Sequence, residues 1–209
     1  MDFSFTAEQQ ELRRAVRDLA DDHCPTSRLR EVIESPTGYD GGLWRRLAGD
    51  LGLAGIALSA ASGGSDGSFV DLAIVLEEAG RALLPVPLLG TTIAAVALER
   101  SDEATAVEVL PAVATGATAA ALVVGPEVVS DGDRLTGSAD HVVDGGPADL
   151  LVVANESGLW LLDATATGVE VRPSATLART RSYATVRLEG ATARPVGDPA
   201  AAAAAVDLL

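Results

Sequence analysis

Residues 102–125 read DEATAVEVLPAVATGATAAALVVG, and the pattern of the sequence changes within this stretch. The spacing of apolar residues before Gly116 predicts a helix that ends at that glycine. From Thr118 the run TAAALVVG is short and β-branched, which is typical of a strand. We therefore expect helices before this point and strands after it, with a boundary between Gly116 and Ala119.

The first half carries repeated helix signals. Thr6 with Gln9 forms a capping box ahead of a helix that Pro25 ends, and Ser68 with Asp71 marks the start of another. The spacing of Glu77 and Arg81 predicts an i,i+4 ion pair. Further helices are expected over residues 27–34 and 42–51. The segment LLGTTIAAVALER, residues 88–100, is apolar on nearly every face and is expected to be buried.

The second half predicts seven short strands separated by Gly, Asp or Pro. They cover residues 118–125, 133–137, 139–143, 149–155, 158–164, 168–172 and 184–190. In the last of them, Ala184, Val186 and Leu188 alternate with polar residues, as in a half-buried strand. Asp198 and Pro199 then predict a helix start, and Ala200 to Ala205 continue it with the best helix former. The predicted fold class is α+β: an N-terminal all-α domain, then a β-barrel or sandwich domain, then the start of a C-terminal helical domain.

Composition excludes several classes of function. The net charge is −15 with dispersed acidic residues, so no basic stripe is present for a nucleic-acid partner. Cys24 is the only cysteine, which fits a reducing compartment. The N-terminus lacks the pattern of a signal peptide, and no apolar run reaches the ~20 residues that span a bilayer. These features predict a cytoplasmic protein without membrane contact.

Local motifs for catalysis are absent from the sequence. It contains no GxGxxG, phosphate loop or GxSxG, and no His/Cys cluster that would bind a metal.

Several segments, in order, resemble the acyl-CoA dehydrogenase family. They are FSFTAEQQELRRAVRDLADDHCP at residues 3–25, LWRRLAGDLGLAGIAL at 43–58, GGSDGSFVDLAIVLEEAGRALLPVP at 63–87, LTGSADHVVDGGPADLLVV at 135–153 and RTRSYATVRLEGATARPVGDP at 179–199. The resemblance covers nearly the whole chain.

The resemblance implies three regions. Residues 1–117 would be the N-terminal helical domain, 118–197 the middle β domain, and 198–209 the first turns of a truncated C-terminal helical domain. The alternative is that the alanine helix closes a complete small protein.

The resemblance also implies FAD as the cofactor and an acyl-CoA thioester as the substrate. Family members remove the α proton with a carboxylate while a hydride passes to the flavin. In most members that base is a glutamate of the third domain, so no catalytic residue is assigned in this chain. Glu77 and Glu78 lie on a helix that the family uses for packing, and we expect them to be solvated or capped.

The family's cofactor-binding positions fall on Val123, Gly125, His141 and Val143. His141 would replace a stacked tryptophan, and Val143 would replace a hydroxyl donor with a methyl group, which leaves the polar edge of the ring unpaired. His141 is alternatively a solvent-facing residue at the end of a strand.

Nearby side chains have plainer interpretations. Asp144 reads as a turn residue before two glycines rather than a ligand. Arg179 and Arg181 are expected to form salt bridges at a surface or subunit interface. Trp44 and Trp160 are expected to be core or interface anchors.

These features favour a subunit that lacks part of the flavin site and pairs with a homologous catalytic subunit. Actinobacterial heteromeric dehydrogenases of steroid side-chain CoA esters are of this kind, and FAD would be shared with or supplied by the partner. The 209 residues alone would then be inactive. One alternative is an ordinary FAD-dependent homotetrameric acyl-CoA dehydrogenase whose C-terminal domain is missing here. A non-catalytic scaffold is the second alternative.

Overall fold

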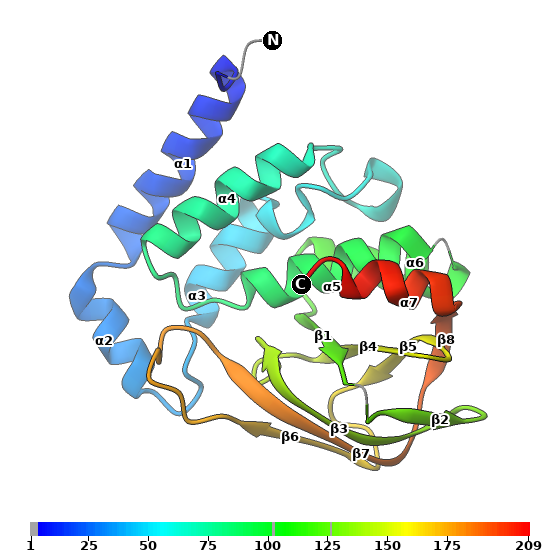
Figure 1. Cartoon of the computed structure of the whole chain (residues 1–209). Coiled ribbons are helices and arrows are strands. Elements are labelled where there is room, and N and C mark those ends of the chain that lie inside the picture. Colours follow the sequence, from blue (N-terminus) through cyan, green and yellow to red (C-terminus); the bar gives the residue numbers. More distant parts are fainter. Residues whose placement is uncertain (1–3, 102, 126) are drawn as a thin grey trace.

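The computed structural model describes residues 4–101, 103–125 and 127–209. The helical part comprises α1 (Ala7–His23), α2 (Thr26–Glu34), α3 (Gly41–Trp44), α4 (Phe69–Arg81), α5 (Leu88–Ser101) and α6 (Ala104–Ala114). The β part follows, and α7 (Pro199–Val206) comes last (Figure 1). This order confirms the predicted fold class. The expected helix start at Asp102 lies outside the described residues.

The strands form two four-stranded sheets. The first has the order β1 (Ala120–Val124), β4 (Leu150–Asn155), β5 (Gly158–Asp163) and β8 (Arg194–Gly197). The second has the order β2 (Val129–Asp131), β3 (Arg134–Val143), β7 (Tyr183–Thr192) and β6 (Val169–Pro173). Only the β1–β4 pair is parallel among the pairs of the described strands.

The first sheet is buried on both faces. Side chains from both sheets, among them Val123, Val153 and Val186, form a core between the sheets. The opposite face of the first sheet packs against α5, α6 and α7, which lie over it as a helical layer (Figure 1). A strand buried on both faces needs a continuous apolar run rather than alternation, which explains the sequences AALVV and LLVVAN.

The α5 segment is buried as predicted, because it packs between α6, α7 and β1. Ala202 and Ala205 of α7 belong to the same core. This core contains residues from both sides of position 117, so the helical and β parts share it. The division at residue 117 remains a prediction.

Several local expectations need correction. The two strands expected over residues 133–143 are one strand, β3, with a bulge between Ala139 and Val142, and the sequence patterns missed β2 and β8. The expected helix at residues 42–51 becomes a π-helix from Arg45 to Asp50. The predicted Glu77–Arg81 ion pair is also wrong, because Arg81 pairs with Glu78 and Glu77 pairs with Arg13.

Glu78 is capped by arginine side chains, which is one of the two expected roles, and Glu77 is exposed, which is the other. The Glu78 side chain is 1% exposed and accepts hydrogen bonds from Arg17 Nη2 at 2.6 Å and Arg81 Nε at 2.7 Å. Hydrogen bonds from Arg17, followed by those from Arg81, lower the pKa of Glu78 to about 2 despite burial. The cluster ties α1 to α4 and therefore has a structural role.

Candidate functional site

The four positions expected to hold a cofactor do not converge on one cavity. The side chain of Val123 has no exposed surface and points into the core between the sheets, so it cannot contact a ligand. Only the backbone of Val123 could contact a ligand. The sequence could not reveal this, because a fully apolar strand gives no sign of which residues face which layer.

Gly125 follows β1 and lines a groove of about 450 Å³. A Cβ at this position would lie 2.9 Å from Ala139 Cβ and 3.0 Å from the carbonyl oxygen of Ser138, so glycine is required for the close packing of β1 on β3. The groove is also bounded by the β1–β2 connection, the β4–β5 turn and Val206 of α7. Its walls combine valine and alanine side chains with the polar residues Ser130, Asn155, Glu156 and Ser157.

His141 lies in the bulge of β3, is exposed and has a φ of +59°. This left-handed backbone is uncommon outside glycine, asparagine, aspartate and histidine, and it turns the side chain toward solvent. Val143, at the end of β3, is half-buried and pairs with Tyr183 of β7. No hydrogen-bonding side chain stands at either the Val123 or the Val143 position.

Asp144 is the buried carboxylate nearest these positions. It is 2% exposed, has a φ of +53°, and accepts a hydrogen bond from the backbone N–H of Gly90 at 2.8 Å. Burial raises the pKa of Asp144 to about 6, although the Gly90 hydrogen bond and the charge of Arg181 both act to lower it. The turn role that the sequence predicted is therefore combined with a contact to the first turn of α5.

Gly90 makes this contact possible. A Cβ on Gly90 would lie 2.6 Å from the carbonyl oxygen of Val143 and 2.8 Å from Asp144 Cβ. Only glycine lets α5 approach the β3–β4 turn this closely. The sequence signal was a lone glycine within an apolar helix, which indicates a packing requirement but not its partner.

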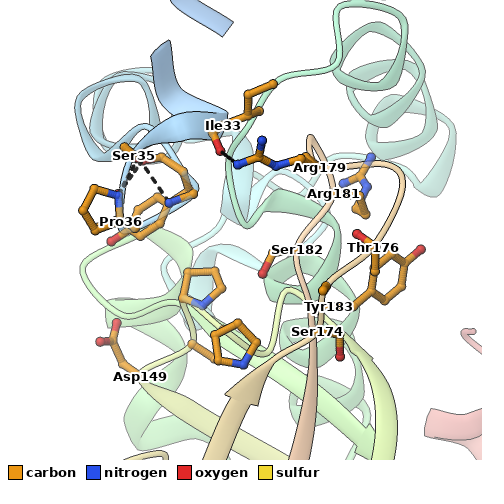
Figure 2. Close-up of a pocket in the computed structure, with 18 residues that line it drawn as sticks. Ile33, Ser35, Pro36, Asp149, Ser174, Thr176, Arg179, Arg181, Ser182 and Tyr183 are labelled. Carbon is orange, nitrogen blue, oxygen red and sulfur yellow. Dashed lines mark hydrogen bonds between the residues drawn. The ribbon is translucent and has the colours of Figure 1, made fainter. Parts of the chain in front are cut away.

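A second and larger cavity, of about 650 Å³, lies between the α2–α3 loop, the β3–β4 turn and the β6–β7 loop (Figure 2). Arg179 reaches across it, donating to the carboxylate of Glu34 at 2.6 Å and to the carbonyl of Ile33 at 2.5 Å. Arg181, Ser182 and Tyr183 line the same space. The predicted salt bridge of Arg179 is thus present, whereas no salt bridge joins Arg181 to any described residue.

Both tryptophans are buried. Trp44 donates its indole N–H to the carbonyl of Gly116 at 2.9 Å, which fixes the end of α6. Trp160 donates to Asn155 within the first sheet.

Among the described residues, no group of three or more His, Cys, Asp or Glu side chains could hold a metal. No helix in the described ranges is long and apolar enough to cross a membrane.

A sequence profile described as "Acyl-CoA dehydrogenase, N-terminal domain" matches residues 6–117. The chain belongs to the acyl-CoA dehydrogenase family. It is 36% identical over 205 residues to the protein named acyl-CoA dehydrogenase IpdE2 of Mycobacterium tuberculosis. That alignment covers 97% of this chain and 58% of the relative, so the chain spans little more than half of the curated relative's length.

Solved structures agree with this membership. The chain is similar to a protein titled "Tcur3481-Tcur3483 steroid ACAD G363A variant", with a TM-score of 0.87 and 33% identity over 96% of this chain and 60% of that one. It also resembles a chain of the ChsE4-ChsE5 complex from Mycobacterium tuberculosis, with a TM-score of 0.88 and 28% identity. The latter match covers 100% of this chain and 62% of that one.

The family implies FAD, and the side chains at the four expected positions do not fit the flavin ring. Val123 is enclosed in the core, Val143 is aliphatic, and Gly125 has no side chain. His141 alone could donate a hydrogen bond, and it is exposed on a bulge. A flavin ring needs hydrogen-bond partners for its polar edge, and these four side chains offer only one candidate.

Proposed function

We propose that this chain belongs to one subunit of a heteromeric acyl-CoA dehydrogenase acting on a steroid side-chain CoA ester. The assembly would carry out FAD-linked α,β-dehydrogenation of the thioester. A homologous partner subunit would supply most of the flavin contacts and the base that removes the α proton. The 209 residues by themselves would not catalyse the reaction.

One observation carries this proposal: three of the four positions where the family is expected to hold its cofactor, Val123, Gly125 and Val143, lack a hydrogen-bonding side chain. Val123 is buried between the sheets, and Val143 presents methyl groups at the end of β3. An ordinary subunit that binds its own flavin would need polar groups there. The similarity to chains of the Tcur3481-Tcur3483 and ChsE4-ChsE5 proteins supports a partnered arrangement.

The chain would contribute side chains that line the substrate site rather than groups that react. The groove at Gly125 and Val206 combines the aliphatic side chains of β1 and α7 with polar groups of the β4–β5 turn. The Asp144–Gly90 contact holds the end of β3 against α5 and lies apart from this groove. The aliphatic part of the groove is suited to positioning the acyl chain of a thioester.

The test is expression of the full-length gene product alone and together with a homologous dehydrogenase subunit. We expect a colourless protein alone and a yellow complex that oxidises an acyl-CoA when both are present. A yellow protein that oxidises an acyl-CoA without a partner would establish the alternative, an ordinary homo-oligomeric enzyme. A colourless complex with no activity would contradict the proposal and indicate that the chain is a non-catalytic scaffold.

A further inference from the structure

The β6–β7 loop, residues 174–182, reaches from the β part of the molecule to the end of α2, and we call it the strap. It contains no helix or strand, and none of its side chains is buried. Leu177, its only large apolar residue, is fully exposed. A segment without buried side chains gains no stability from a core, so its position depends on polar contacts.

Both ends of the strap are fixed by backbone hydrogen bonds. The Ser174 N–H donates to the carbonyl of Tyr183 at 2.8 Å, and the Asp144 N–H donates to the carbonyl of Ser182 at 2.8 Å. Arg181, next to the second end, is half-buried and lines an apolar pocket between α4 and α5. Any movement is therefore confined to the middle of the strap.

Arg179 joins the middle of the strap to the helical part. Its guanidinium donates to the Glu34 carboxylate at 2.6 Å and to the Ile33 carbonyl at 2.5 Å (Figure 2). Both acceptors belong to the last turn of α2, where backbone carbonyls lack helical partners and the helix dipole is negative. That turn has no basic residue of its own, so Arg179 supplies a cation from 145 positions away. Among the described residues, no other hydrogen bond or ion pair links residues 175–180 to a helix.

This attachment is weak. The side chain of Arg179 is 52% exposed and that of Glu34 is 69% exposed. An ion pair in such contact with water contributes little to stability, and salt screens it. A segment that depends on one contact of this kind opens at a measurable frequency while the rest of the fold stays intact.

The cavity of about 650 Å³ lies beside the strap. Residues of the strap form one wall and the α2–α3 loop forms another, with Arg179 reaching between them (Figure 2). The two tyrosines of the whole chain both line this cavity and are half-buried: Tyr39 in the α2–α3 loop and Tyr183 at the start of β7. Movement of the strap away from α2 would expose both rings.

We propose that the strap opens and closes over this cavity and that the two hydrogen bonds of Arg179 hold it closed. Ile33 and Glu34 fix the closed position, and the anchored ends at Ser174 and Ser182 are the hinges. The strap thereby controls the access of solvent and small solutes to the cavity. This inference goes beyond the proposed function and does not depend on it, because none of the expected cofactor-binding positions lines this cavity.

Limited proteolysis of the full chain with thermolysin measures the opening. Thermolysin cuts before leucine, and a loop must leave its closed position to enter a protease, so the rate of cleavage before Leu177 follows the open fraction. We expect Arg179→Gln to raise this rate about threefold to thirtyfold. Glu34→Gln should raise it less, since the Ile33 carbonyl still accepts from Arg179, and the double variant should match Arg179→Gln alone.

Arg172→Gln is the matched control, because Arg172 is an exposed arginine of the neighbouring β6 that pairs with Glu170 at 2.7 Å. It should leave the rate of cleavage unchanged. Raising sodium chloride from about 20 mM to about 500 mM should accelerate cleavage of the wild type about twofold relative to Arg179→Gln, because salt screens the pair with Glu34. Equal rates in the wild type, Arg179→Gln and Glu34→Gln would overturn the proposal.

The cavity itself is followed with 3-fluorotyrosine, which labels Tyr39 and Tyr183 alone. A soluble paramagnetic reagent should broaden both fluorine signals more strongly in Arg179→Gln than in the wild type or in Arg172→Gln. Faster cleavage without greater broadening would show that the strap moves but does not close the cavity, and this result would also overturn the proposal.

Discussion

Replacing Asp144 with asparagine should stabilise the protein at alkaline pH. Asparagine keeps an oxygen that can accept from the Gly90 N–H and tolerates the positive φ. It removes the charge of a residue that is 2% exposed. The change therefore isolates the cost of burying the carboxylate.

The magnitude follows from the pKa of Asp144, which burial raises from 3.8 to about 6. A difference of this size corresponds to roughly 3 kcal/mol of destabilisation once the group is ionised in both states. Because the folded pKa is the higher one, this cost is absent below pH 3.8, grows as the pH rises, and is complete above pH 6. New polar hydrogens on asparagine offset part of the gain, so we expect Asp144→Asn to add about 1–2 kcal/mol at pH 8.

Urea unfolding of wild type and variant at pH 4 and pH 8 measures the effect. We expect the variant to gain stability at pH 8 and to show little or no gain at pH 4. Asp149→Asn is the control, because Asp149 is an exposed carboxylate in the same turn and also accepts one backbone N–H. A variant that loses more than about 1 kcal/mol at pH 8 would show that the Gly90 hydrogen bond and Arg181 outweigh desolvation, and would refute the reasoning.

Two further predictions concern contacts between elements of the fold, one between α1 and α4 and one between α5 and the β3–β4 turn. Glu78→Gln should destabilise the protein by about 2–4 kcal/mol at neutral pH, because it leaves Arg17 and Arg81 without their buried partner. The lowered pKa of Glu78 means that this contribution is present above pH 4.5 and is lost as the pH falls toward 2, so the variant should show a flatter acid-denaturation curve. Gly90→Ala should cost several kcal/mol, because the added Cβ meets the Val143 carbonyl at 2.6 Å; thermal unfolding checks this against Gly80→Ala, where a Cβ meets nothing within 4 Å. A Gly90 variant as stable as the Gly80 variant would show that α5 can shift away from the β3–β4 turn.

Much of the fold could be predicted from local sequence signals. The capping boxes at Thr6 and Ser68 mark the starts of α1 and α4, and Asp198 with Pro199 marks the start of α7. These signals work because the residues satisfy backbone groups within a few positions of themselves. The β2 and β8 strands were missed, since three or four residues are too few to establish a period.

The candidate site was harder to predict, because its features depend on contacts between distant segments. The enclosed position of Val123 follows from the two-sheet packing, which its apolar neighbours do not encode. The burial of Asp144 depends on Gly90, which is 54 residues away. The large cavity joins Tyr39 to Tyr183, and nothing in either local sequence indicates the other.

The number of flavins bound per polypeptide tests the central claim most directly. Native mass spectrometry of the full-length gene product, alone and in complex with a homologous dehydrogenase subunit, gives this number. We predict no FAD on the isolated subunit and fewer FAD molecules than polypeptide chains in the complex. One FAD bound to each copy of this chain in the absence of a partner would contradict the account.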